Sequence, residues 1–225
     1  MHILVLGGSG RTGRLIIKEA LSKGHSVVAL VRSPSTFPLG SRPGITLVTG
    51  TPMKPEDIAT AFAVSETSPE AVIVALSLKR LSDSPFAALS PDAPNRLMED
   101  SVANTITVMK KHGTKRIIVM SQWGAGNSWN SMNFLFRAMF TYSNMKHGLA
   151  AHNAVDEETR KADVDFVLVR ATVLADGDAT PVKIYPDNGK AIGFLPKVTR
   201  ASVAKFMVEA CEKNDFVGMS PVITN

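Results

Sequence analysis

The segment TYSNMKHGLAAH, residues 141–152, contains Tyr142, Lys146 and His152, which could move a proton. Tyr142 and Lys146 stand four positions apart, so they share one face if the segment is helical. His152 follows six positions later, and histidine is a suitable proton donor near neutral pH. Gly148 is a poor interior helix residue, so we expect the helix before the sixth strand to begin after it. On one continuous helix His152 would lie roughly 120° around from Lys146, and the two would hardly face the same reacting group.

A glycine-rich stretch indicates what such a group would react with. The first apolar strand ends in GGSGRTG, and a helical pattern begins at once. Glycines permit a tight turn and a close backbone approach to a pyrophosphate, while the helix N-terminus supplies free N–H groups. Two registers match the sequence. Gly8, Gly10 and Gly13 form GxGxxG, and Gly7, Gly10 and Gly13 form GxxGxxG.

The end of the second strand favours one cofactor over another. NAD-binding proteins often carry Asp or Glu there to accept from the ribose 2′-hydroxyl. This chain has VALVRSPS, with Arg32 and no acid nearby. An acid would repel a 2′-phosphate, whereas arginine offers a bidentate fork. Arg11, inside the glycine stretch, could reach the same phosphate. The sequence therefore predicts NADP(H) in preference to NAD.

The order of strand and helix patterns predicts the fold. Apolar runs typical of strands occur at 2–6, 26–31, 45–49, 71–77, 116–121 and 165–170, with helical patterns near 11–23, 55–64, 95–112 and 149–162. Two further short strands are expected at 182–186 and 221–224, and Thr199 is expected to cap a last helix that runs to about residue 213. Near-continuous apolar strands between helices indicate a doubly wound parallel α/β sheet of the Rossmann type, as a single domain over residues 1–225.

Long connections indicate where a substrate would bind. Segments 78–95 and 122–148 begin at the carboxyl ends of strands, where open α/β sheets bind ligands. Together with the C-terminal part 171–225 they are expected to form the substrate site. The region after the fifth strand is rich in aromatic residues and methionine, which suits either a lid over an apolar small-molecule substrate or an ordinary core helix. Trp123 directly follows the strand end and is the best candidate for a pocket wall.

Composition excludes several other classes of function. A net charge of +5 is spread over dispersed basic residues with no nucleic-acid motif, and no apolar run is long enough to span a bilayer. Cys211 is the one cysteine and falls on an apolar helical face, so a buried thiol and a reducing, cytoplasmic location are expected. The five histidines have no metal-ligand spacing, so no metal is expected. The sequence leaves open whether the chain is a monomer or a homodimer.

Taken in order, GGSGRTG, VALVRSP, AVIVAL, KRIIVMS and DFVLVR resemble the atypical short-chain dehydrogenases/reductases. The nearest branch is similar to the NmrA-like NAD(P)H-binding group that includes biliverdin-IXβ/flavin reductase, and the C-terminal stretch is similar to fungal members. The resemblance implies an NADPH-dependent reductase of a carbonyl, quinone or conjugated planar apolar acceptor, with a role in secondary metabolism. Two alternatives remain open: a non-redox isomerase, dehydratase or cyclase, and an NADP(H) sensor that binds a protein partner without turnover.

The resemblance also implies roles for individual cofactor residues. Arg32 would hold the 2′-phosphate, and Thr51 would lie near the adenine, where the family usually has an acid. The phosphates would be surrounded by Gly7, Ser9, Gly10, Arg11, Thr12 and Gly13, and the ribose beside nicotinamide by Ala75, Leu76 and Ser77.

On the substrate side the resemblance leaves two proton donors open. Ser121 ends the fifth strand where the family places a hydroxyl, and Gln122 could face the substrate. The polar residue that faces nicotinamide in the family lies eighteen positions before the strand arginine Arg170, which is His152 here. Tyr142 with Lys146 would instead match the main short-chain dehydrogenases, where lysine depresses the pKa of a tyrosine that protonates the carbonyl.

Overall fold

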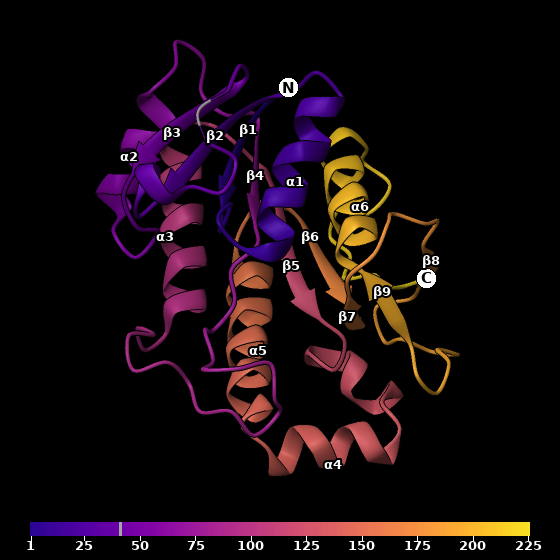
Figure 1. Cartoon of the computed structure of the whole chain (residues 1–225). Helices are drawn as coiled ribbons and strands as arrows, with labels where there is room; N and C mark the ends of the chain where they lie inside the picture. Colours follow the sequence, from indigo (N-terminus) through magenta and orange to yellow (C-terminus); the bar gives the residue numbers. More distant parts are fainter. Residues whose placement is uncertain (41) are drawn as a thin grey trace.

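The core of the molecule is a sheet of eight strands in the order β3-β2-β1-β4-β5-β6-β10-β8. The computed structural model describes residues 1–40 and 42–225 (Figure 1). The strands are β1 (His2–Leu6), β2 (Ser26–Val31), β3 (Ile45–Thr49), β4 (Ala71–Val74), β5 (Arg116–Gln122), β6 (Asp165–Ala171), β8 (Lys183–Tyr185) and β10 (Val222–Thr224). All neighbours from β3 to β10 pair in parallel, and β8 pairs antiparallel with β10. The predicted Rossmann-type fold is confirmed.

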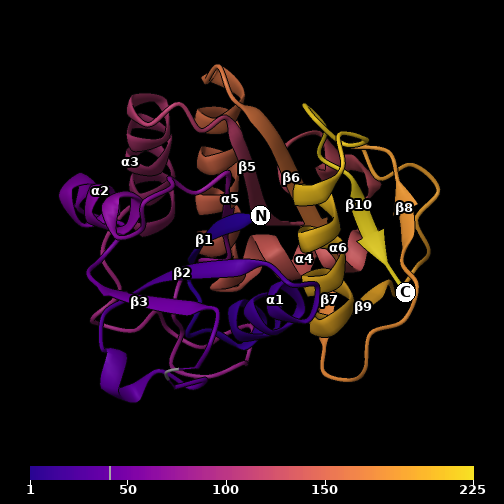
Figure 2. The same ribbon diagram turned by 90° about the horizontal axis from the view of Figure 1, so that it is seen from above.

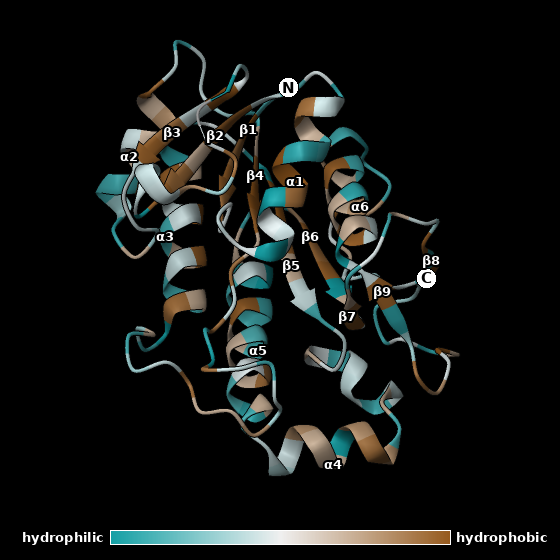
Figure 3. Cartoon of the chain, viewed as in Figure 1, coloured by the Kyte–Doolittle hydropathy of each residue, from teal (hydrophilic) through white to brown (hydrophobic). Residues whose placement is uncertain are grey.

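Helices cover both faces of the sheet, as Figure 2 shows from above. They are α1 (Arg11–Ser22), α2 (Pro55–Ala63), α3 (Leu97–Lys111), α4 (Phe134–Tyr142), α5 (Met145–Lys161) and α6 (Arg200–Glu212). The first and last pack against one face of the sheet, and α2, α3 and α5 pack against the other. Because both faces are buried, the strands are apolar along nearly their whole length (Figure 3). Burial also raises the pKa of the Cys211 thiol to about 12, as expected for a structural cysteine.

The structure corrects the expected start of α5. The helix begins at Met145, so Gly148 lies inside its first turns instead of before it. Interior glycine costs about 1 kcal/mol relative to alanine. Packing of α5 against α3 and the sheet outweighs that local preference, since Ala151 and Val155 are buried in the shared core. His152 therefore lies on the same continuous helix as Lys146.

Two other local differences concern the carboxyl edge of the sheet. β4 ends at Val74, three residues earlier than predicted, and Ala75 leaves the strand to pack against the glycine loop. Two short strands, β7 (Val173–Ala175) and β9 (Lys197–Thr199), were not predicted and pair in parallel beside the main sheet. The Thr199 side chain accepts from the Ser202 N–H, which confirms the predicted cap of α6.

No helix in the described part of the chain is both long and apolar enough to cross a membrane. Within the same residues, no group of three or more His, Cys, Asp or Glu side chains is arranged to hold a metal ion.

Candidate cofactor and substrate site

The glycine loop between β1 and α1 needs its glycines for three different close approaches. Gly7 has φ +84°, and a Cβ there would collide with the carbonyl oxygen of Ala75 at the end of β4. A Cβ at Gly13 would collide with the carbonyl oxygen of Gly7, to which the N–H of Gly10 donates at 3.0 Å. The turn is therefore built on Gly7, Gly10 and Gly13, which favours the GxxGxxG register. Gly8 is also tightly packed, with its Cβ position 2.8 Å from a methyl of Ile17.

The first turn of α1 leaves backbone donors free at this loop. Gly10 is the N-cap residue and offers no side-chain cap, and the turn carries no acidic residue. Such a helix start attracts anions, because its N–H groups lack partners and the helix dipole is positive there. The Thr12 side chain is buried beneath the loop, and Arg11 is half exposed above it.

Arg32 lies beside the glycine loop because the strands that carry them are neighbours. In the β1–β2 register Leu6 is opposite Leu30, so Gly8 and Arg32 each lie two residues past a paired position. Arg32 is exposed, and among the described residues it makes no ion pair or side-chain hydrogen bond. Its guanidinium is therefore available to an anion at this edge of the sheet.

Thr51 follows β3, the strand next to β2, and stands where the family usually has an acidic residue. Its backbone N–H donates to a carboxylate oxygen of Asp57 at 2.8 Å, and its hydroxyl accepts from Met53. Asp57, from the first turn of α2, brings a carboxylate close to the turn where the sequence motif lacks one. The sequence analysis did not identify Asp57, because the acid lies six residues away from the motif position.

A cavity of about 770 Å³ opens next to the glycine loop, at the carboxyl edge of the sheet. Its walls come from segments 75–89, 120–152 and 171–200, from Met98 and from the start of α1. It brings together these residues that the sequence analysis named: Gly10, Arg11, Thr12, Ala75, Leu76, Ser77, Ser121, Gln122, Trp123 and His152. Five other residues that the sequence analysis named do not line this cavity, namely Gly7, Ser9, Gly13, Arg32 and Thr51.

Three residues that line the cavity each carry a buried polar atom without a hydrogen-bond partner in the described structure. These atoms are the hydroxyl of Ser121, the amide nitrogen of Gln122 and Nδ1 of His152. Buried polar groups are normally paired, and leaving one unpaired costs about 1–3 kcal/mol. Unpaired donors and acceptors from β5 and α5 in one cavity are typical of a site that a ligand completes.

Burial sets the protonation state of His152. The ring is 9% exposed, and its removal from water lowers its pKa from 6.5 to about 4. At neutral pH His152 is therefore uncharged. A neutral ring can donate one hydrogen bond and accept another, so it can orient a polar group or relay a proton.

The lowered pKa predicts an acid-dependent loss of stability. His152 is protonated more readily in the unfolded chain than in the folded one, so its contribution is full above pH 6.5 and is lost as the pH falls toward 4. The loss amounts to about 3 kcal/mol at most. We expect urea unfolding of His152→Leu to depend less steeply on pH in this window than unfolding of the wild type. Parallel pH profiles of the two proteins would contradict the assignment.

The structure does not support Tyr142 and Lys146 as one catalytic pair. Tyr142 is the last residue of α4, and Lys146 is the second residue of α5, so the two do not stand at i and i+4 on a shared helix. Ser143 and Asn144 lie between the two helices, as the C-cap of α4 and the N-cap of α5. Tyr142 is 82% exposed, Lys146 is exposed, and neither lines the cavity.

The apolar wall of the cavity belongs to a small core cluster of its own. Trp123, Met132, Phe136 and Phe140 pack together, with Trp123 edge-on to Phe136 and its indole N–H donating to Ser131 at 2.7 Å. All four also line the cavity. The two interpretations of segment 122–140, core helix and pocket wall, therefore both apply to the same side chains.

A buried ionic network holds the elements behind this wall. Arg170 is fully buried at the end of β6 and pairs with Asp156 of α5 at 2.6 Å. It also donates to Asn127 and to the carbonyl of Asp187, while Asp156 binds Arg160 at 2.6 Å. Breaking a buried pair of this kind is strongly destabilising. The network therefore fixes α5, which carries His152, relative to β6.

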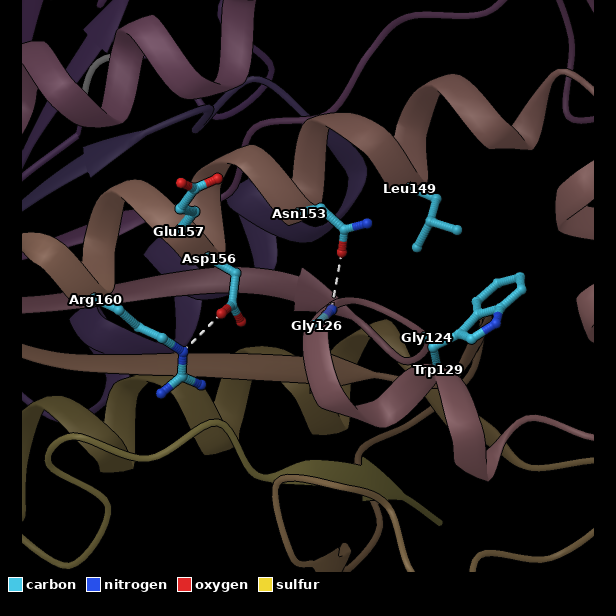
Figure 4. Close-up of a pocket in the computed structure, with 8 residues that line it drawn as sticks. All are labelled: Gly124, Gly126, Trp129, Leu149, Asn153, Asp156, Glu157 and Arg160. Carbon is cyan, nitrogen blue, oxygen red and sulfur yellow. Dashed lines mark hydrogen bonds and ion pairs between the residues drawn. The ribbon is translucent and has the colours of Figure 1, made fainter.

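A second, shallower cavity of about 550 Å³ lies along α5 next to that network (Figure 4). Figure 4 shows Asn153 pointing to the loop after β5, where its side-chain oxygen accepts from the Gly126 N–H at 2.8 Å. Trp129 and Leu149 face each other across its other end. Asn153 and Asp156 are engaged with Gly126 and Arg160, whereas Ser121, Gln122 and His152 of the larger cavity keep unpaired atoms.

Several residues that line the larger cavity were not identified from the sequence. Met120 precedes Ser121 on β5, and Thr172 follows Arg170 beyond the end of β6. Basic side chains at its rim were also missed, namely Lys79, Arg80, Lys197 and Arg200. A position just past a strand end was the available signal for Thr172. Lys79 and Arg80 lie in the connection after β4, and Lys197 and Arg200 lie in β9 and at the start of α6, elements whose packing beside the cavity the sequence does not reveal.

The glycine loop, which we also call the glycine cradle, leads into a helix whose first N–H groups are free, and a cavity lies at the carboxyl ends of the parallel strands. Together these features define a dinucleotide-binding protein of the Rossmann class. The family model described as NAD(P)H-binding matches residues 7–214. The chain belongs to this NAD(P)H-binding family.

Curated relatives match the chain in part. It is 35% identical over 121 residues to the photosystem II assembly factor Ycf39 of Synechocystis sp., covering 54% of this chain and 33% of the relative. It is 31% identical over 122 residues to 3-diazoavenalumate denitrifying reductase of a Streptomyces species, covering 54% and 38%. The matches thus span a little over a third or less of the length of these relatives.

Solved structures match the whole chain. An NAD-dependent epimerase/dehydratase from Bacillus halodurans has 25% identity and a TM-score of 0.76, covering 100% of this chain and 94% of its own. The anaerobillin reductase ChuY from Escherichia coli O157:H7 has 17% identity and a TM-score of 0.76, covering 100% and 97%. A short-chain dehydrogenase/reductase from Veillonella parvula in complex with NADP has 15% identity and a TM-score of 0.77, covering 100% and 94%. The last two likenesses establish the fold alone.

Proposed function

We propose that the protein is an NADPH-dependent reductase that transfers a hydride to a carbonyl, quinone or conjugated planar apolar acceptor. The observation that carries the proposal is the unpaired polar set of Ser121, Gln122 and His152 beside an apolar wall, next to a cradle for a dinucleotide. When bound, the cofactor supplies the hydride. Among the similar proteins, one from a Streptomyces species and ChuY from Escherichia coli are named as reductases.

The residues present suit an NADP(H) molecule. The glycine cradle and the start of α1 would hold the pyrophosphate, through Gly7, Ser9, Gly10, Arg11, Thr12 and Gly13. Arg32, exposed and free at the end of β2, would bind the 2′-phosphate, and Thr51 with Asp57 would lie toward the adenine. Ala75, Leu76 and Ser77 line the larger cavity and would contact the ribose beside nicotinamide.

In this arrangement the chain orients the acceptor and handles the proton. Ser121 would bind a polar atom of the acceptor, and Gln122, on the other face of β5, would bind a second polar group, since both side chains have unmet hydrogen-bonding capacity. His152 would donate a hydrogen bond to the atom that Ser121 binds and relay a proton to it from solvent, in keeping with its neutral state at pH 7. Trp123, Phe136 and their neighbours would exclude water and favour an apolar planar molecule.

A panel of menadione, FMN and an aromatic aldehyde tests the proposal. We expect NADPH oxidation with at least one quinone or flavin acceptor, and stoichiometric reduction of that acceptor. Product formation without NADPH consumption would favour a non-redox isomerase or dehydratase on the same fold. Tight NADPH binding with no turnover of any panel member would contradict the reductase proposal and favour a cofactor sensor.

A further inference from the structure

The connection between β4 and α3 forms a hairpin that borders the larger cavity. The N–H of Ser90 donates to the carbonyl of Lys79 at 2.8 Å, and the N–H of Leu81 to the carbonyl of Ala88 at 3.0 Å. Arg80 and Leu89 form an antiparallel bridge between these bonds. We refer to residues 79–90 as the cover hairpin, because several of its residues line the cavity.

Two side-chain contacts hold the cover hairpin across the cavity. In its turn, the carbonyl of Phe86 accepts from Asn144, between α4 and α5, at 2.9 Å. In the same turn, both carboxylate oxygens of Asp83 accept from Arg11, which lies inside the glycine loop, at 2.8 and 3.1 Å. The hairpin therefore connects the start of α1 to the start of α5.

Asp83 binds the guanidinium of Arg11, to which a cofactor phosphate would also bind. Among the described residues, Asp83 is the one acidic side chain lining a cavity that five basic side chains border, namely Arg11, Lys79, Arg80, Lys197 and Arg200. The hydrogen bond and charge of Arg11 lower the pKa of Asp83, with smaller contributions from Arg200 and Arg80, so Asp83 is an anion at neutral pH. Two anions at one guanidinium repel each other, and a dinucleotide phosphate at Arg11 must displace the carboxylate.

We propose that Asp83 is an internal competitor of the cofactor phosphates, and that the Arg11–Asp83 pair is a latch that the bound dinucleotide breaks. The latched protein binds the dinucleotide weakly, so the apparent affinity is reduced by the fraction of unlatched molecules. Both side chains are well exposed, so the latch opens easily and the reduction is moderate. The inference rests on the proposed binding of NADPH and adds a control of that same site.

The test measures NADPH affinity and association rate for Asp83→Asn and for a matched control, Asp92→Asn. Asp92 is an exposed acid on the same connection and forms no ion pair in the described structure. We expect Asp83→Asn to bind NADPH about three- to tenfold tighter at low salt, mainly through faster association, with a smaller gain at high salt. Asp92→Asn should match the wild type.

A double-mutant cycle separates the latch from a general charge effect. In an Arg11→Gln background the latch is absent, so adding Asp83→Asn should leave the NADPH affinity unchanged. An equal gain in both backgrounds would show that Asp83 acts by repulsion alone and would overturn the latch. Weaker binding of Asp83→Asn with faster dissociation would also overturn it, since the hairpin would then close over the cofactor instead of competing with it.

Failure of the proposed function and failure of the latch give different experimental results. If wild-type protein binds NADPH but reduces no acceptor, the reductase proposal fails while the Asp83 measurement still applies. If wild-type and Asp83→Asn proteins bind NADPH equally, the latch is rejected whatever the turnover. Thermal unfolding of each variant at pH 7.5 confirms that the folded protein is compared.

Discussion

Replacement of Arg32 by aspartate is expected to weaken NADPH binding about a hundredfold and to change NADH binding little. Charge-assisted hydrogen bonds to a phosphate contribute about 1.5–3 kcal/mol, and the new carboxylate adds repulsion of the 2′-phosphate. Arg32 is free of other contacts in the described structure, so the substitution removes no structural interaction. Titration of both cofactors against the variant measures the difference.

A charge-matched control separates a local contact from the overall field. Lys110→Asp makes the same change in net charge at an exposed position near the end of α3, which lies at the amino ends of the strands. It should bind NADPH as the wild type does. Equal losses for NADPH and NADH in Arg32→Asp, or no loss for either, would reject the assignment of NADP(H).

The second large effect concerns the proton donor. Once an accepted substrate is known, His152→Ala should slow single-turnover hydride transfer at least about tenfold, because the variant lacks the hydrogen bond that orients the acceptor. Tyr142→Phe should have little effect, since Tyr142 is exposed and lies outside the cavity. His147→Ala is the matched control, being an exposed histidine of α5 that does not line the cavity.

The pattern of losses distinguishes three mechanisms. A large loss for His152→Ala alone supports the neutral histidine as the orienting and proton-relaying group. A large loss for Tyr142→Phe alone would restore the tyrosine–lysine mechanism and would require α4 to move in the complex. Full rates for both variants would indicate that solvent protonates the product directly. Circular dichroism of each variant excludes unfolding as the cause.

Local helix preference was the weakest guide to this site. Gly148 predicted that α5 begins after it, and Tyr142 and Lys146 would share a face only if the whole segment were helical. The first prediction is wrong because α5 includes Gly148, and the condition for the second is not met because α4 ends at Tyr142. Packing of α5 against α3 and the sheet exceeds the cost of about 1 kcal/mol for one glycine, and a sequence window does not contain that term.

The sequence by itself determined the features that depend on neighbouring residues in the chain. Apolar strands between amphipathic helices specify a parallel sheet, and the glycine stretch directly after β1 specifies a tight turn into α1. The position of Arg32 beside the glycine loop could also be predicted from the sequence, because β2 directly follows α1 in the chain and pairs with β1. In each case a short connection leaves few ways for the elements to pack.

Only the tertiary structure decided which distant side chains meet. Ser121 comes from β5 and His152 from α5, and the sequence does not fix which way these two elements face each other. Both residues line one cavity because α5 packs against β5. Arg11 and Asp83 lie 72 positions apart, and their pairing depends on the path of the cover hairpin. Such contacts follow from how whole elements pack, because burial of apolar surface is summed over the fold and no local pattern records it.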